Sequence, residues 1–330
     1  MANYIDYISE QRERILAMNE DSKPVRLSEI YKDVNKILSI GGPDYQRIAK
    51  KLSEEELTRS KVRASFKYED KKDRGEALYT GFVAVMLWGG LGSDGKTFGH
   101  LEKAMSQDNK KDVVEKLLRV KDLLDDGKIA DAFGSMCPRQ ENKILGIDVS
   151  YFTKLLFFMN NAGDGSNPFP LIYDNWGWRI HAALLISKGQ TADLTKYFIV
   201  RADLKKDGET IKILPFVILQ DSRTRRIKAY QNYIHLMWEQ SRSLSESLFP
   251  GDLEQFLFGR PRKGEDAASL DNPRNILLPY IRQGLAELFR TVEVDTVSDD
   301  ADNTGEEKHH EPYDEAAAKA KTILTDERTH

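Results

Sequence analysis

A lysine and an aspartate twenty residues apart are the residues of this chain best suited to do chemistry together. Lys154 lies in the apolar run 149–159, which has the length of a helix, and Asp174 opens the run 174–185 just after the extended stretch 169–173. A cation in an apolar helix is costly unless it is paired or used. A lysine in such surroundings loses its proton more easily and can become a nucleophile. The two side chains therefore form a candidate pair of amine nucleophile and carboxylate.

Simpler roles exist for both residues. The stem of Lys154 could lie along apolar neighbours while its amine reaches water, which is the commoner arrangement when such a lysine is considered alone. Asp174 could serve only as the N-cap of the helix that follows it, because aspartate is a preferred capping residue. Capping and catalysis are compatible, since both place the carboxylate at a helix start.

The bulk composition is ordinary for a soluble globular protein. The 330 residues suffice for one large domain or two lobes, and 40% are hydrophobic while 31% are charged. No apolar stretch reaches the length of a membrane span, and the first residues lack the pattern of a signal peptide. Cys137 is the only cysteine, which excludes a disulfide framework and fits a reducing compartment. We therefore expect a cytoplasmic protein that does not enter a membrane.

The formal net charge of −4 is unevenly distributed. Residues 291–330 hold 12 Asp and Glu against 4 Lys and Arg, a net charge of −8, so the other 290 residues carry 41 acids and 45 bases, a net of +4. A mildly basic body permits a polyanion as partner without requiring one. The acidic tail is expected to be disordered.

Metal and nucleotide sites are not indicated. His100, His181 and His235 are widely spaced and lack the rhythm of metal ligands, so we expect them to be structural. The chain has no Gly-Lys-Ser/Thr phosphate loop and no zinc cluster. The sequence therefore predicts no metal ion and no cofactor.

Hydrophobic periodicity predicts a mainly α-helical protein with few alternating runs. The domain division that we expect is an N-terminal helical region (1–65), a larger helical domain (66–290) and the acidic tail (291–330). The stretch 195–220 is apolar but does not decide between strand and mixed structure, and 160–170 has the glycine, asparagine and proline content of a loop. Predicted helices cover 26–40, 77–87, 100–126, 127–145, 149–159, 175–187, 222–248, 251–258 and 273–290.

Several segments together resemble the helix-hairpin-helix DNA glycosylase superfamily, and within it the 8-oxoguanine glycosylase branch. The match is carried by Gly146, by SYFTKLLFF (150–158) and by PLIYDNWGWRIHAAL (170–184). ALYTGFVAVMLWGG (77–90) and WEQSRSLSESLFPGDLEQFLFG (238–259) support it. The resemblance covers roughly residues 75–260, and it implies two helical lobes around a cleft.

The resemblance also implies a chemistry. Lys154 matches the catalytic lysine of the superfamily, whose amine attacks C1′ of a damaged nucleotide and forms a Schiff base that can drive strand cleavage. Asp174 matches the aspartate that assists departure of the base and stabilises the positive charge developing on the sugar. The base must leave the duplex stack to be reached. The partner expected is therefore DNA, and the protein is expected to be a monomer associated with the nucleoid that needs no cofactor. The sequence does not identify a partner for the acidic tail.

Contacts to DNA are assigned more loosely. Trp88 begins the loop that fills the gap in the duplex in related enzymes, although a tryptophan more often anchors a core. Phe158, one turn after Lys154, is a candidate wall of the base pocket. Arg179 could pair with a carboxylate or reach a phosphate, while Trp176 and Trp178 are expected to pack. Two basic groups could grip phosphates or form solvated faces, namely Arg223, Arg225, Arg226 and Lys228, and Arg260, Arg262 and Lys263.

One departure from the superfamily keeps two alternatives open. The hairpin usually reads Gly-x-Gly and holds a DNA phosphate on its backbone N–H groups. Here Gly146 is followed at the third position by Asp148, whose carboxylate caps a helix but repels phosphate. The chain could therefore be a non-catalytic DNA-binding protein that retains the fold, or an interaction scaffold whose tail binds a partner. The sequence does not name the base.

Overall fold

The computed structural model describes residues 3–19, 21–93, 95–160, 169–207, 210–259 and 272–297. Most of the predicted loop at 160–170, the basic group at 260–263 and the tail beyond residue 297 lie outside these ranges.

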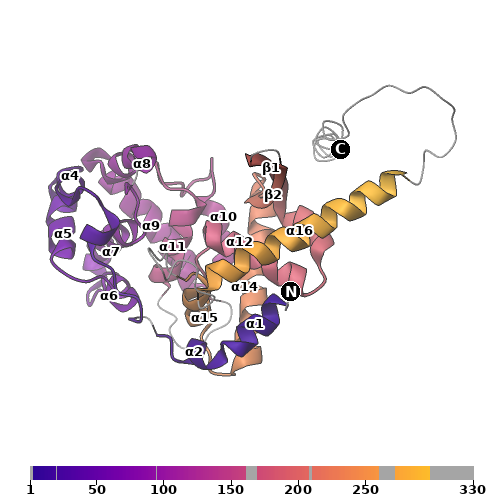
Figure 1. Ribbon diagram of the computed structural model, residues 1–330. Coiled ribbons are helices and arrows are strands. Elements are labelled where there is room, and N and C mark those ends of the chain that lie inside the picture. The colour runs from indigo at the N-terminus through magenta and orange to yellow at the C-terminus, as the bar shows by residue number, and fades with distance from the viewer. Residues whose placement is uncertain are drawn as a thin grey trace.

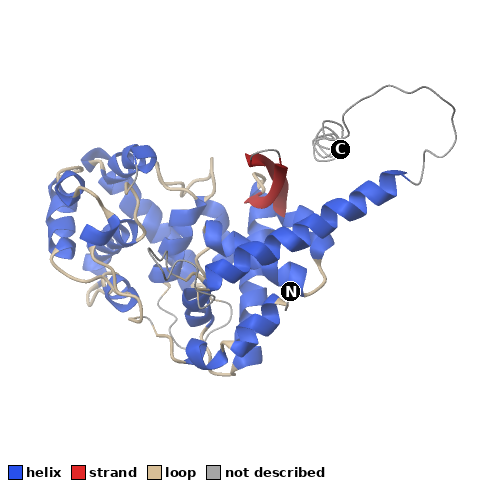
Figure 2. Ribbon diagram, viewed as in Figure 1, coloured by secondary structure: helices blue, strands red, loops and turns tan. Residues whose placement is uncertain are grey.

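Helices dominate the described residues, as the periodicity predicts (Figures 1 and 2). The α-helices are α1 (Tyr4–Glu10), α2 (Arg12–Leu16), α3 (Leu27–Ile30), α4 (Val34–Leu38), α5 (Pro43–Ser53), α6 (Arg59–Ala64), α7 (Arg74–Trp88), α8 (Gly95–Met105), α9 (Lys110–Asp125), α10 (Ile129–Met136), α11 (Val149–Met159), α12 (Asn175–Ser187), α13 (Leu194–Tyr197), α14 (Arg223–Leu244), α15 (Pro250–Leu257) and α16 (Pro273–Val297). The mainly α fold class is confirmed.

The undecided stretch 195–220 forms a β-hairpin. Strands β1 (Phe198–Asp207) and β2 (Thr210–Leu219) pair antiparallel, with Phe198 opposite Leu219 and Asp207 opposite Thr210. β2 contacts α12 and α16, so the hairpin is attached to the same helices that carry the C-terminal half of the fold. Its run IKILPFVIL is too continuous in its apolar residues for periodicity to separate a strand from a buried helix.

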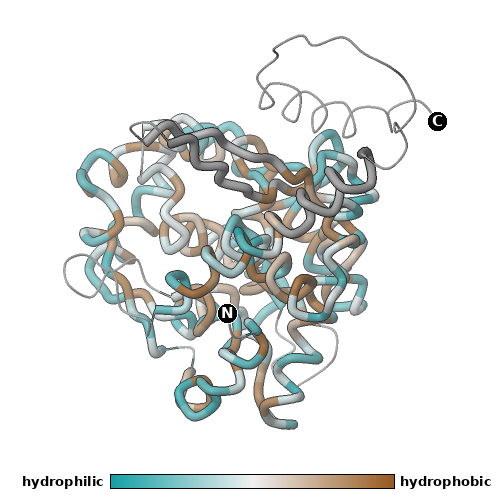
Figure 3. Tube along the Cα trace, turned by 45° about the vertical axis from the view of Figure 1, so that its right-hand side comes forward, coloured by the Kyte–Doolittle hydropathy of each residue, from teal (hydrophilic) through white to brown (hydrophobic). Residues whose placement is uncertain are grey.

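The helices form two groups that meet at α10 and α11. α4 to α9 lie together at one side, and α12, α14, α16 and the hairpin lie at the other (Figure 1). α11 contacts α6, α7, α9 and α10, which explains why it is buried on nearly all sides. In Figure 3 the hydrophobic stretches run through the interior while hydrophilic residues gather at the outer turns. A cleft between the two groups remains a prediction.

The N-terminal helices are bonded to the second half of the chain. The side-chain amide of Asn3 donates to the carbonyl of Ser187 at 3.2 Å, and Arg12 Nε donates to the carbonyl of Leu244 at 2.9 Å. A single cluster of buried residues extends from Tyr4 to Leu285. The predicted boundary at residue 65 therefore does not coincide with a separate core, and α16 continues past residue 290. The domain division stays a prediction.

A tight turn lies just before α11, in the connection from α10, at the position expected for the turn of the helix-hairpin-helix motif. Ile147 N–H donates to the carbonyl of Ile144 at 3.2 Å, and Gly146 has φ +78°. A positive φ in the third position of a β-turn favours glycine. A Cβ on Gly146 would also lie 2.3 Å from the carbonyl oxygen of His100. The turn therefore requires glycine for both backbone conformation and space.

Candidate active site

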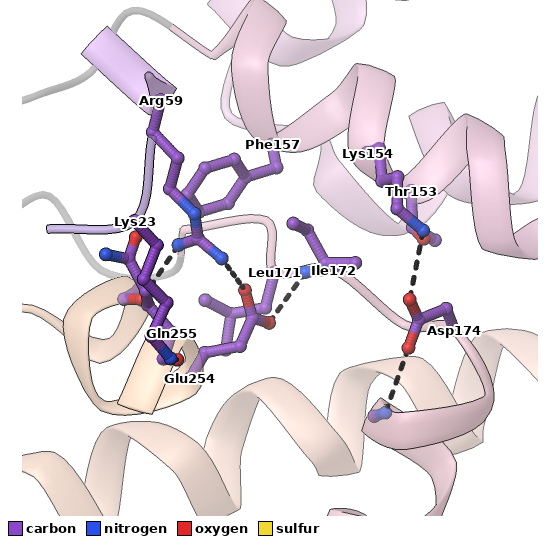
Figure 4. A network of polar contacts seen from close by, with 12 residues as sticks. Lys23, Arg59, Thr153, Lys154, Phe157, Leu171, Ile172, Asp174, Glu254 and Gln255 are labelled. Atoms are coloured by element: carbon purple, nitrogen blue, oxygen red, sulfur yellow. Dashed lines mark hydrogen bonds and ion pairs between the residues drawn. The ribbon is translucent and has the colours of Figure 1, made fainter. Parts of the chain in front are cut away.

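Lys154 is held inside the protein by two acceptors. It lies in the second turn of α11, and only 8% of its surface is exposed. Nζ donates to the carbonyl of Ser150 at 2.8 Å and to Oδ2 of Asp174 at 3.0 Å (Figure 4). A Cβ on Gly89, at the end of α7, would lie 3.1 Å from Cδ of the lysine, so the glycine leaves room for the stem. The amine is therefore paired and does not snorkel to water.

The carboxylate of Asp174 performs two tasks, one with each oxygen. Oδ1 caps α12 by accepting from Trp176 N–H at 2.9 Å and from Gly177 N–H at 3.3 Å, while Oδ2 faces Lys154. Burial by itself would raise the pKa of Asp174, but the lysine and the two backbone N–H groups lower it below its ordinary value. The carboxylate is thus ionised at neutral pH, and its capping role leaves one oxygen for the partner.

The extended segment before Asp174 is fixed by side chains from three helices. Its successive N–H groups donate to Tyr230 Oη at 3.1 Å, to Glu254 Oε1 at 2.8 Å and to Thr153 Oγ1 at 3.0 Å; the donors are those of Leu171, Ile172 and Tyr173. Buried backbone donors need such partners because water cannot reach them. α14, α15 and α11 together therefore set the place at which Asp174 enters α12. Figure 4 shows this segment between Glu254 and the Lys154 pair.

Glu254 is a buried carboxyl group that the sequence analysis did not single out. It has no exposed surface, and Arg59 Nη2 lies 3.6 Å from its Oε2. Burial raises the pKa of Glu254 to about 8, against the opposing effect of the Arg59 guanidinium. The residue lies 82 positions from its backbone partner Ile172, and within its short helix it looks like any other polar residue. No local signal could have found it.

Removing the Glu254 carboxyl group should destabilise the fold. In Glu254→Ala the buried N–H of Ile172 and the hydroxyl of Tyr233 lose their acceptor, and we expect the free energy of unfolding to fall by about 2–4 kcal/mol. Glu239 is a suitable control, because its carboxylate pairs with Lys188 at 2.7 Å on the surface. Glu239→Ala should cost no more than about 1 kcal/mol. Denaturant unfolding of the two variants measures both values, and equal losses would contradict the structural role of Glu254.

His181 supports the same region as a neutral ring. Nδ1 lies 2.7 Å from Tyr173 Oη and Nε2 lies 2.7 Å from Asn232 Oδ1. The amide oxygen can only accept, so Nε2 carries the proton and Nδ1 accepts from the tyrosine. Burial lowers the pKa of His181 to about 4. The geometry is that of a satisfied core histidine.

This low pKa predicts how stability depends on pH. Between the ordinary value of 6.5 and about 4 the unfolded chain binds a proton that the folded protein does not, so the free energy of unfolding falls as the pH drops. The loss from His181 should reach about 2 kcal/mol at about pH 5. His181→Gln should flatten this dependence. Denaturant unfolding at several pH values compares the slopes, and parallel slopes for wild type and His181→Gln would contradict the assignment.

The two aromatic residues predicted to meet the base pack against each other, Phe158 from α11 and Trp88 from the end of α7. The ring centroids of Trp88 and Phe158 are 5.1 Å apart in an edge-to-face contact. Phe158 has no exposed surface, so a role as pocket wall requires a rearrangement. Trp88 is half-buried, and Arg59 lies over its ring. Its contacts are those of a packing residue, and insertion into DNA stays a prediction.

The predicted basic group on α14 is partly occupied by local bonds. Arg226 donates to the carbonyl of Gln220 at 2.8 Å and pairs with Asp221 at 2.7 Å. Arg223 is exposed and donates to the carbonyl of Gly134 at 3.2 Å, while Arg225 is exposed. Phosphate contact by Arg223 and Arg225 therefore remains a prediction, and Arg226 would first have to leave its partners.

The hairpin residue Asp148 acts as a helix cap. It is the N-cap of α11, with Oδ1 2.7 Å from Val149 N. Lys143 bends back to the carbonyl of Ile147, and the charge of Asp148 acts on this half-buried amine, whose pKa is lowered first of all by burial. The carboxylate of Asp148, which was expected to repel phosphate, thus has the amine of Lys143 close to it, in the same connection before α11.

Comparison with known proteins identifies the family. A protein-family model described as "Putative 8-oxoguanine DNA glycosylase OGG-like protein" matches residues 34–258, well over half of the chain. The chain belongs to this family. Membership in the OGG-like family confirms the resemblance seen in the sequence and implies DNA as the substrate. No curated protein and no solved structure matches significantly.

The OGG-like match begins earlier than the resemblance seen in the sequence, at residue 34 rather than near 75. It therefore includes α4, α5 and α6, which were expected to belong to a separate N-terminal region. None of the described helices has the length and apolar character needed to cross a membrane. The described residues also contain no group of three or more His, Cys, Asp or Glu side chains that could bind a metal ion.

Proposed function

We propose that this OGG-like protein is a DNA glycosylase that removes a damaged or modified base by attack of the Lys154 amine on C1′, and that it also cleaves abasic sites. The observation that carries the proposal is the pair itself. An almost buried lysine and an ionised aspartate lie 3.0 Å apart, one on α11 and the other capping α12. An amine beside a fixed carboxylate suits a reaction in which positive charge develops on a sugar.

The expected steps of the reaction follow from the charges of Lys154 and Asp174. Lys154 gives up a proton, which ends on the departing base, so that its nitrogen lone pair can bond to C1′. As that bond forms, the bond from C1′ to the base breaks and its electron pair leaves with the base. Asp174 stabilises the positive charge on the sugar during this exchange. Opening of the sugar ring then gives a Schiff base on Nζ. Loss of a proton from C2′ expels the 3′ phosphate and cleaves the strand.

Release of free base tests the proposal. Duplexes that each carry one oxidised, alkylated or deaminated base are incubated with the protein, and the released base is identified by mass spectrometry. We expect one substrate class to give free base and, on heating with alkali, a broken strand. If every substrate stays intact while the protein still binds the duplexes, the enzymatic proposal fails.

A second candidate function is DNA binding without catalysis. It is favoured by Asp148 in the hairpin and by the complete burial of Phe158, which leaves that ring no surface for a base. In this case binding should depend on salt concentration and should survive Lys154→Ala, with no base released from any substrate.

A further inference from the structure

Two arginines lie against one tryptophan beside Asp174. Trp176 is in the first turn of α12, two residues after the aspartate. Cζ of Arg179, from the same helix, lies 4.5 Å from the centroid of the indole ring, and Cζ of Arg274, from the first turn of α16, lies 4.0 Å from it. Stacking on an aromatic ring holds a planar guanidinium in place while leaving its edge donors available.

The contact between the two helices positions this cluster. α12 packs against α16, and Gly284 of α16 approaches so closely that a Cβ there would lie 2.7 Å from the side chain of Ile186. Arg274 is further held by its Nε, which donates to the carbonyl of Phe258 at 2.5 Å. Arg179 and Arg274 are therefore brought together by tertiary packing, although 95 positions separate them in the sequence.

The cluster has an excess of positive charge. Within the part of the chain that the structure describes, no carboxylate forms an ion pair with Arg179 or Arg274. Both are half-buried, and burial lowers the pKa of each, while Asp174 acts in the opposite direction. Repulsion adds a smaller lowering of the pKa, from Arg282 on Arg179 and from Arg179 on Arg274. The aspartate already serves Lys154 and the cap of α12. Half-buried cations without a counterion are costly, and an anionic ligand would offset that cost.

The chemistry of these donors selects the ligand. A guanidinium presents its N–H groups as a fork that matches two oxygens of a phosphate. The phosphates of a nucleic acid strand flank every sugar, and the cluster lies next to the carboxylate that faces Lys154. We infer that Arg179 and Arg274, held against Trp176, form a phosphate clamp for the phosphodiester beside the nucleotide that enters the Lys154 site. The inference rests on the proposed function for the identity of that nucleotide.

Binding to a duplex with a stable abasic-site analogue tests the clamp without requiring catalysis. Arg179→Gln and Arg274→Gln should each weaken binding about tenfold and reduce the slope of log affinity against log salt by about one. The matched control is Arg242→Gln, because Arg242 also stacks on a tryptophan, Trp238, at 5.3 Å. The affinity of Arg242→Gln for the duplex should equal that of the wild type. Affinities of both clamp variants equal to that of the control would overturn the inference.

A neutral methylphosphonate at the phosphate next to the analogue locates the contact. This substitution should weaken wild-type binding and abolish the difference between wild type and Arg274→Gln; a difference that persists wherever the methylphosphonate is placed contradicts the clamp. Arg274→Lys keeps the charge but lacks the planar fork, so it serves if the glutamine variant is unstable. It should also bind more weakly than wild type, and unchanged affinity would count against the clamp.

Two further measurements test whether the cluster binds phosphate and distinguish failure of the clamp from failure of the enzymatic proposal. Inorganic phosphate replaces chloride at constant ionic strength. It should displace DNA from the wild type at lower concentration than from Arg274→Gln, and equal displacement from both proteins would overturn the inference. Base release is measured in parallel. If the wild type releases no base but the arginine variants lose affinity, the enzymatic proposal fails and the clamp stands. If base is released and the variants bind normally, the clamp fails and the enzymatic proposal stands.

Discussion

Lys154→Gln should abolish formation of a covalent adduct with DNA in the presence of borohydride and should reduce base release by about a thousandfold or more. Glutamine has nearly the length of lysine and can still donate to Ser150 and Asp174, but its amide nitrogen has no lone pair available for attack. The expected loss is therefore a loss of chemistry with little change in DNA binding. Trapping on gels and single-turnover base release measure it.

The control for this variant is a second buried lysine. Lys121 is 2% exposed and pairs with Asp125 four residues later on α9, so Lys121→Gln removes a buried ammonium group at another place. This variant should form the adduct and release base at nearly the wild-type rate. Thermal unfolding of both variants shows whether each is folded at the assay temperature. If Lys154→Gln still forms an adduct, Lys154 is not the nucleophile.

Asp174→Asn should slow base release by about a hundredfold to a thousandfold. Asparagine is as good an N-cap as aspartate, so its oxygen can keep the bonds to Trp176 and Gly177 while the negative charge is lost. Slower base release would then result from the lost negative charge and not from a change at the start of α12. We expect DNA affinity within a few-fold of wild type, because the removed charge is negative and largely buried.

A capping aspartate far from the site is the matched control. Asp33 caps α4 by accepting from Lys36 N–H at 3.0 Å. Asp33→Asn should leave base release unchanged. Rapid base release by Asp174→Asn, with its fold intact, would reduce Asp174 to a structural cap and remove half of the proposed catalytic pair.

Part of this arrangement could be predicted from sequence because its signals are local. The long apolar run around Lys154 and the aspartate before a helix start predict α11 and α12, and Gly146 predicts the turn. They made the two side chains a candidate pair, which the resemblance to the glycosylases favoured over a lysine that reaches water. These features depend on spacing within about thirty residues, where helix periodicity and capping preferences apply directly.

Other parts depend on contacts between distant segments. Glu254 binds the backbone of Ile172 across 82 positions, and Arg274 reaches Trp176 from another helix. Contacts between distant segments leave no repeating pattern in the sequence. For the same reason the sequence could not decide whether Arg179 pairs with a carboxylate or reaches a phosphate. The hairpin at 198–219 was undecided for a different reason, since a short continuous apolar run fits a strand and a buried helix equally well.

The position of the covalent adduct tests the central claim most directly. The wild-type protein is incubated with a duplex that contains an abasic site, the Schiff base is reduced with borohydride, the DNA is digested, and the modified peptide is sequenced by mass spectrometry. The account predicts that the sugar remnant is attached to Lys154. Attachment to another lysine, such as Lys143 in the hairpin, or base release without any adduct would contradict it.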